Sequence, residues 1–196
     1  GRFAEAAQHA ARGAAIAEEH GFPVWFGAAT MHGAIARGSE QPAASIPVLT
    51  HMLGLWQAGG AELNRPFFLW GLALCQRAAG DVDGALATLE EATTQAKRSG
   101  EAFMASEQHR LRGELYAARS AGQDPRAREE ILRAATLARE QGASELELRA
   151  LSSLGEPRPG PGTPELARLR ELLARSRAAG EDHEELRAAE ARLVAS

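Results

Sequence analysis

The chain has 196 residues, a formal net charge of −4 at pH 7 and one cysteine, Cys75. Acidic and basic residues alternate along it without a basic stripe of the kind that a phosphate backbone requires, so we expect no direct nucleic-acid partner. One cysteine excludes an internal disulfide, and no apolar run approaches the roughly 18–20 residues of a membrane-spanning helix, which leads us to expect a cytoplasmic protein with no membrane contact.

Alanine, leucine, glutamate and arginine predominate, so we expect an all-α fold with essentially no strand. The expected helices span residues 3–20, 24–37, 46–58, 66–79, 82–98, 102–119, 126–141, 144–154, 164–178 and 182–194. Two prolines, Pro42 and Pro47, fall where the third helix should begin. It either starts late, near Ile46, or is bent.

A period of about 40 residues organises these ten helices. The small residues Gly33, Ala73, Gly113, Ser152 and Ala191 each lie inside an expected helix and stand 39 or 40 positions apart. The glycines that end the preceding helices, Gly21, Gly60, Gly100, Gly142 and Gly180, recur at intervals of 38 to 42. Repeats of this length are typical of solenoids, so the sequence predicts an α-solenoid, a superhelix of antiparallel helix hairpins.

The predicted repeat array spans residues 1–154, and its first hairpin is incomplete because the chain enters on a segment with the character of a second helix. We therefore expect a fragment of a longer protein. Residues 155–163 form a loop rich in proline and glycine, and residues 164–196 form a helix pair that caps the array.

The helices carry the packing pattern of a known repeat. Ala85, Leu89 and Ala92 stand at i, i+4 and i+7, and Gly113 and Tyr116 form a G-x-x-Y pair. Both patterns resemble those of tetratricopeptide repeats, in which small residues allow two helices to approach closely.

A narrower resemblance covers about half of the chain. It is carried by Trp56, "GAELNRPFFL" at 60–69, "GE" at 100, "HRLRGEL" at 109–115 and "GASELELRALSSL" at 142–154. These elements are similar to the tetratricopeptide-like C-terminal region of large bacterial signalling proteins. Such proteins join that region to an AAA-type ATPase module and, in different members, to a class III adenylate or guanylate cyclase domain or a helix-turn-helix transcription domain. The resemblance implies a scaffold or sensor arm beside an effector, which these residues do not identify.

No catalytic motif stands out in the chain, so we expect no enzyme activity in this segment and no cofactor. The six histidines are spread over separate repeat units. Only His9 and His20 share a helix, and at eleven residues apart they are too far from each other to hold one metal ion, so no metal site is predicted. Cys75 lies in an apolar segment and is predicted to be a buried, unreactive thiol.

In tetratricopeptide arrays, the inner-helix positions three before, one after and four after the small residue line the concave side, and the first and last of these are used here. That register predicts a partner-binding surface of six residues: Thr30, Arg37, Trp70, Arg77, Arg110 and Arg149. A tryptophan flanked by arginines suits an extended peptide with acidic side chains or a free carboxylate. The alternative is that the arginines are solvated and paired with Glu107, Glu114 and Glu147 at helical spacing.

Three functions remain open at this stage. The main hypothesis is a protein-binding module that docks a partner protein or peptide, including effector domains of the same polypeptide. The second is a small-molecule sensor whose ligand changes the curvature of the superhelix. The third is an oligomerisation scaffold, and the oligomeric state itself is left open.

Overall fold

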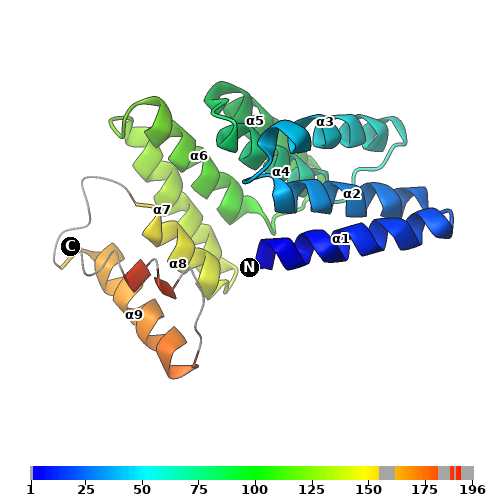
Figure 1. Cartoon of the computed structure of the whole chain (residues 1–196). Coiled ribbons are helices and arrows are strands. Elements are labelled where there is room, and N and C mark those ends of the chain that lie inside the picture. Colours follow the sequence, from blue (N-terminus) through cyan, green and yellow to red (C-terminus); the bar gives the residue numbers. More distant parts are fainter. Residues whose placement is uncertain (1, 155–161, 181–185, 188, 191–196) are drawn as a thin grey trace. The chain divides into compact units, whose positions relative to one another are not determined.

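The computed structural model describes residues 2–154, 162–180, 186, 187, 189 and 190, and within them the chain is helical without a strand (Figure 1). The helices of this described part are α1 (Arg2–Glu19), α2 (Pro23–Arg37), α3 (Pro42–Ala58), α4 (Arg65–Ala78), α5 (Val82–Ser99), α6 (Ala105–Arg119), α7 (Pro125–Glu140), α8 (Ser144–Ser152) and α9 (Pro164–Ala178). None of them is both long and apolar enough to cross a membrane.

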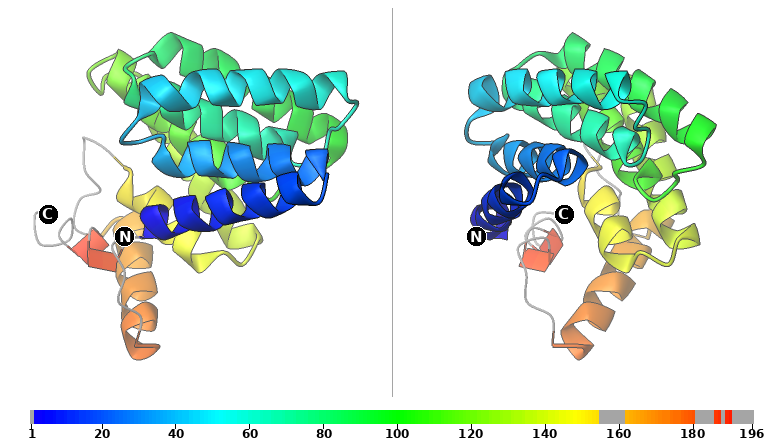
Figure 2. Two further views of the ribbon diagram at one scale, coloured as in Figure 1. Left: turned by 45° about the vertical axis from the view of Figure 1, so that its right-hand side comes forward. Right: turned by 90° about the vertical axis from the view of Figure 1, so that its right-hand side faces the viewer.

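The helices fall into two compact units, Gly1–Ala102 and Phe103–Ser196, which contain α1–α5 and α6–α9 respectively. In each unit every helix packs against the next one along the chain (Figure 2). The even-numbered helices also pack against each other, α2 on α4 in unit 1 and α6 on α8 in unit 2. Each unit therefore has an inner pair of helices with outer helices beside it.

The predicted helices are largely confirmed, with two corrections. Helix α3 begins at Pro42 and contains Pro47, so the late start near Ile46 was wrong. Pro42 is tolerated because the first helical residue needs no intrahelical N–H partner, whereas Pro47 lies inside the helix and removes one intrahelical hydrogen bond. Helix α6 begins at Ala105, since residues 101–104 form the connection instead. The expected helix at 182–194 lies for the most part outside the described residues.

The five glycines predicted to end helices all have positive φ angles, between 68° and 77°. At Gly100 the N–H donates to the carbonyl oxygen of Ala96 and closes the end of α5. A left-handed residue at this position lets the chain reverse into the next helix, and glycine adopts it without a steric cost.

Three of the four register residues that the structure describes, Gly33, Ala73 and Gly113, are buried. Ala73 is fully buried, and a Cβ on Gly113 would lie 2.7 Å from the carbonyl oxygen of Ala127. Helices α6 and α7 therefore approach as closely as the G-x-x-Y pattern requires. Ser152 is only half-buried, and Ala191 lies outside the described residues.

The predicted packing residues of the outer helices form part of the core. On α5, Ala85, Leu89 and Ala92 are fully buried. Phe68 on α4 is only 1 % exposed. The core of unit 1 is built from α2, α3, α4 and α5, and that of unit 2 brings α7, α8 and α9 together. The two cores lie within their own units.

Candidate partner-binding surface

All six predicted binding residues lie on even-numbered helices. Thr30 and Arg37 are on α2, Trp70 and Arg77 are on α4, and the last two, Arg110 and Arg149, are on α6 and α8. Four of them belong to unit 1 and two to unit 2, so the two groups are described separately.

In unit 1 an aromatic row joins the two inner helices. The Trp70 ring packs on Phe67 with the centroids 5.7 Å apart, and Phe67 packs on His32 of α2 at 5.2 Å. Trp70 and Thr30 are half-buried, whereas His32 is exposed. The indole N–H of Trp70 is shielded from solvent and has no acceptor among the described residues, so packing rather than a hydrogen bond holds the ring. The sequence register found Trp70 but missed His32 and Phe67.

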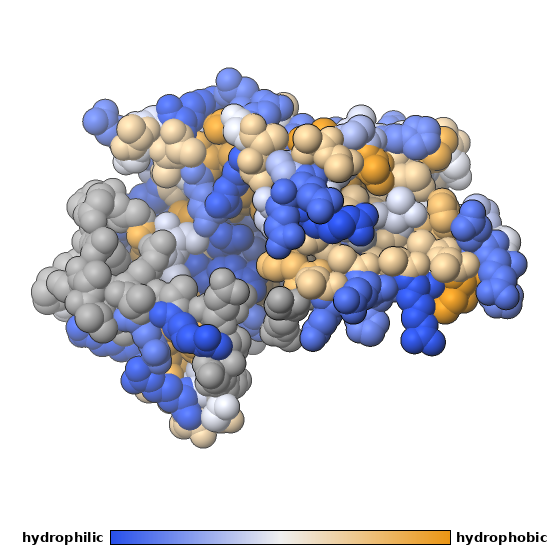
Figure 3. All heavy atoms as spheres, in the orientation of Figure 1, coloured by the Kyte–Doolittle hydropathy of each residue, from blue (hydrophilic) through white to orange (hydrophobic). Residues whose placement is uncertain are grey.

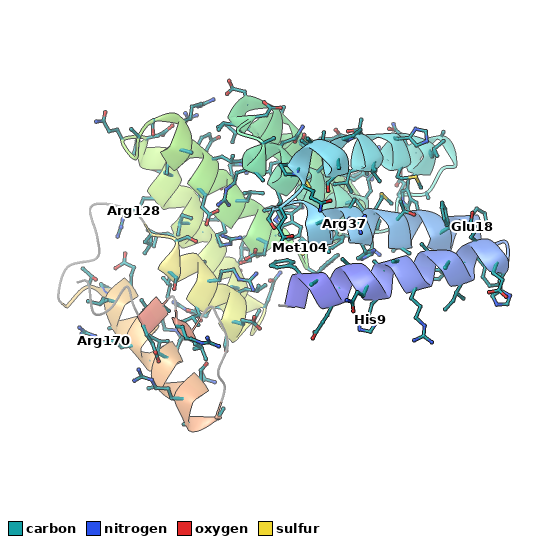
Figure 4. The ribbon with its side chains drawn as sticks, in the orientation of Figure 1. His9, Glu18, Arg37, Met104, Arg128 and Arg170 are labelled. Atoms are coloured by element: carbon teal, nitrogen blue, oxygen red, sulfur yellow. The ribbon has the colours of Figure 1, made fainter. Side chains whose placement is uncertain are left out.

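The two arginines of unit 1 lie at the ends of the inner helices. Arg37 and Arg77 are exposed and occupy the last turns of α2 and α4. Figure 4 shows Arg37 at the end of α2. A cationic side chain there also faces the partial negative charge of the helix C-terminus. Unit 1 thus presents an aromatic row with positive charge at the ends of both helices.

In unit 2 the predicted arginines take part in an internal ion network. Arg110 donates to both carboxylate oxygens of Glu107, at 3.0 and 2.9 Å, and to Glu114 at 2.5 Å. Only 11 % of the Arg110 side chain and 3 % of the Glu107 side chain are exposed. Burial alone would lower the pKa of Arg110, but the hydrogen bonds and charges of the two glutamates outweigh it and raise the pKa.

Arg149 extends this network from α8 to α6. Its guanidinium lies 3.3 Å from Glu107 and 3.4 Å from Glu145, and Ser153 donates to Glu114 at 2.8 Å. Glu107 therefore accepts from arginines of two helices and ties α6 to α8. The alternative pairing of Arg110 with Glu107 and Glu114 is confirmed, although the side chains of Arg110 and Glu107 are nearly buried rather than solvated.

Glu147, the third glutamate of that alternative, links three helices. It is 1 % exposed on α8 and accepts from Arg139 of α7 at 2.7 Å and from Arg168 of α9 at 2.9 and 2.7 Å. Burial would raise the pKa of Glu147, and the two guanidinium groups outweigh it and hold the pKa below its usual value. This junction was not predicted, because its partners are far apart in the sequence.

Unit 2 also contains hollows on its surface. One of about 590 Å³ lies where α6 turns into α7, lined by Gly113, Ala117, Ile131 and Leu132 together with the polar residues Glu114 and Ser153. A second of about 520 Å³ lies between α7 and α9 near Arg139 and Arg168. Both combine apolar and charged walls, as binding pockets for small ligands do.

Cys75 is fully buried in the core of unit 1, as predicted. Burial raises the pKa of its thiol to about 11, so the reactive thiolate is scarce at neutral pH. Within the described residues, no three His, Cys, Asp or Glu side chains are grouped so that they could hold a metal ion.

No protein-family model matches the chain, and no curated protein matches it significantly. The similarity to tetratricopeptide-like regions of bacterial signalling proteins therefore stays a prediction from the sequence.

Proposed function

We propose that this chain is a protein-binding module that docks a partner protein or peptide on the inner helices of unit 1. The observation that carries the proposal is the packing of α2 on α4, which sets Thr30, Arg37, Trp70 and Arg77 on two adjacent helices. The half-buried Trp70 offers an apolar anchor, and the arginines at the helix ends offer charge. This combination suits an extended partner segment with acidic side chains or a terminal carboxylate.

The arginines of unit 2 have a different role in this proposal. To bind a partner, Arg110 would have to leave Glu107 and Glu114, and the nearly buried Glu107 would lose a compensating charge. Breaking such a pair costs several kcal/mol. The network of Arg110, Glu107 and Arg149 thus holds α6 against α8 and keeps the inner pair of unit 2 in place.

We further propose that the units belong to a tetratricopeptide-like solenoid within a cytoplasmic bacterial signalling ATPase. The support is the period of about 40 residues and the motif resemblance, together with the close contact at Gly113. Effector domains of the same polypeptide are then natural candidates for the partner.

Two alternatives have an observation in their favour. The hollow of about 590 Å³ in unit 2 favours a small-molecule sensor. Exposed Phe3 and Ile16 on the outer helix α1 favour an oligomerisation scaffold.

Affinity capture from a bacterial lysate, followed by titration of the purified partner, tests the main proposal. We expect Trp70→Ala to weaken binding by about 2 kcal/mol, which is roughly thirtyfold. Arg37→Ala should weaken binding at low salt and less at moderate salt, because an exposed charge is screened.

Exposed residues of the outer helix α1 provide matched controls. Phe3→Ala and Arg12→Ala should leave the affinity unchanged, since both side chains are exposed on α1. If the partner binds the Trp70 and Arg37 variants as tightly as the parent and loses binding to the α1 variants, the inner-helix assignment is wrong.

A further inference from the structure

Five large apolar side chains are exposed at the turns of unit 1. The exposed fraction of each of these residues lies between 53 and 68 %. The five are Phe22, Val24, Trp25, Leu55 and Leu63. The first three lie in the α1–α2 turn and the first turn of α2. Leu55 lies in the last turn of α3, and Leu63 lies in the connection to α4.

Contacts place these turns at the same end of unit 1. A Cβ on Gly27 of α2 would lie 3.5 Å from the ring of Trp56, so the start of α2 packs beside the end of α3. The indole N–H of Trp56 in turn donates to the carbonyl oxygen of Leu63 at 3.1 Å. Figure 1 shows the α1–α2 turn and the end of α3 together at the right-hand end of the unit, and Figure 3 shows apolar residues reaching that end. Apolar side chains gathered on a surface mark a docking site.

Two of the three helices that end here, α1 and α3, differ in charge from α5 and from the other helix ends. Helices α1 and α3 have no basic residue in their last turn. The other helices of the described part all have at least one arginine or lysine there. A helix C-terminus carries a partial negative charge, which a nearby cation normally offsets.

Acidic residues add to this negative charge. Glu18 and Glu19 are exposed at the end of α1, followed by His20. Helix α5 ends here too, with Arg98 paired with Glu62 of the α3–α4 connection and Lys97 exposed beside it. The apolar side chains of the α1–α2 turn are therefore bordered by a negative rim, which Glu18 and Glu19 form.

We propose that this end of unit 1 docks an amphipathic segment of a partner protein whose large apolar side chains are flanked by lysine or arginine. The negative rim argues for that occupant. A second copy of the chain would place Glu18 and Glu19 against a rim of the same sign, and an anionic membrane would be repelled in the same way. Figure 4 shows Glu18 and Arg37 at opposite ends of the α1–α2 hairpin. The proposed docking surface is therefore separate from Arg37 of the inner-helix site.

Fluorescence anisotropy with synthetic peptides tests this proposal on the full chain. The probe is a labelled amphipathic helix of leucine and lysine, roughly 18 residues or five turns long, and its counterpart replaces lysine with glutamate. We expect the leucine–lysine peptide to bind about tenfold or more tightly than the leucine–glutamate peptide. Trp25→Ser should weaken its binding about tenfold, since an exposed aromatic anchor is lost.

Matched variants distinguish binding of the peptide at this surface from a general attraction of the basic peptide to an acidic protein. Phe3→Ser removes an aromatic side chain that is 68 % exposed near the other end of α1, and it should leave the affinity unchanged. Glu19→Lys should weaken binding more than Glu5→Lys, an exposed residue in the first turn of α1. If Trp25→Ser alters the circular dichroism spectrum and hence the fold, Leu55→Ser tests the apolar surface in its place.

The proposal is overturned if both peptides bind equally, or if Phe3→Ser and Trp25→Ser weaken binding equally. A dimer in sedimentation equilibrium that Trp25→Ser abolishes would assign the surface to a second copy. Binding to phosphatidylcholine–phosphatidylglycerol vesicles that depends on Trp25 would assign it to a lipid surface. None of these results bears on binding at Trp70, so this inference and the proposed function can fail separately.

Discussion

Replacing Gly113 by alanine tests the close contact on which the helix pair α6–α7 depends. The added Cβ would lie 2.7 Å from the carbonyl oxygen of Ala127 and 2.8 Å from Cγ1 of Ile131, and ordinary contacts begin at 3.4 Å. The carbonyl belongs to the backbone of α7, and Ile131 is only 3 % exposed in the core of unit 2, so neither can turn away. The two helices must therefore move apart by several tenths of an ångström.

The cost follows from two opposing contributions. Overpacking costs about 1–3 kcal/mol, whereas replacing glycine by alanine inside a helix gains about 1 kcal/mol. We expect Gly113→Ala to lower the free energy of unfolding by up to about 2 kcal/mol, and Gly113→Leu to lower it further. Each kcal/mol corresponds to a change in Tm of about 4–8 °C for a unit of this size, measured by circular dichroism.

The control substitution is Gly54→Ala in the middle of α3. A Cβ there meets no atom within 4 Å, so only the gain in helix propensity remains. We expect Gly54→Ala to raise the free energy of unfolding by about 1 kcal/mol. If Gly113→Ala and Gly54→Ala both raise Tm, the inferred approach of α6 to α7 is wrong.

Three other residues give independent tests. Arg110→Met should lower the free energy of urea unfolding by about 3 kcal/mol, because it leaves the buried Glu107 with less compensating charge; an unchanged urea midpoint would show that the network contributes nothing. The lowered pKa of Glu147 means that its stabilisation is present above the unfolded pKa of about 4.3 and is lost as the pH falls through the folded pKa. The urea midpoint of the parent should thus fall between about pH 5 and pH 3, and Glu147→Gln should reduce that fall. Cys75, whose pKa is about 11, should react with a thiol reagent at pH 8 only after the protein unfolds; rapid reaction of the native chain would contradict its burial.

The sequence predicted those features that depend on neighbours along one helix. The i+3 and i+4 pairs of Arg110 with Glu107 and Glu114 follow from helical spacing alone. The turn glycines follow in the same way, since the conformation that ends a helix is a local property.

Features that depend on the packing of distant helices were not predictable in this way. Arg149 reaches Glu107 across 42 positions, and Arg168 reaches Glu147 across 21. The start of α3 was misplaced because Pro42 was interpreted as a helix breaker rather than as a first-turn residue. Hydrophobicity alone does not predict the place of Trp25 either, which is 67 % exposed in the first turn of α2.

The indole N–H signals of the three tryptophans in a ¹⁵N-labelled chain test the proposed function most directly. Trp70 lies in the aromatic row of α2 and α4, Trp56 donates to Leu63 within unit 1, and Trp25 is exposed at the turn. Titration with the partner identified by capture should shift the Trp70 signal and leave the Trp56 signal in place, and Trp70→Ala should weaken the binding. A partner that binds without shifting the Trp70 signal would contradict recognition by the inner helices of unit 1.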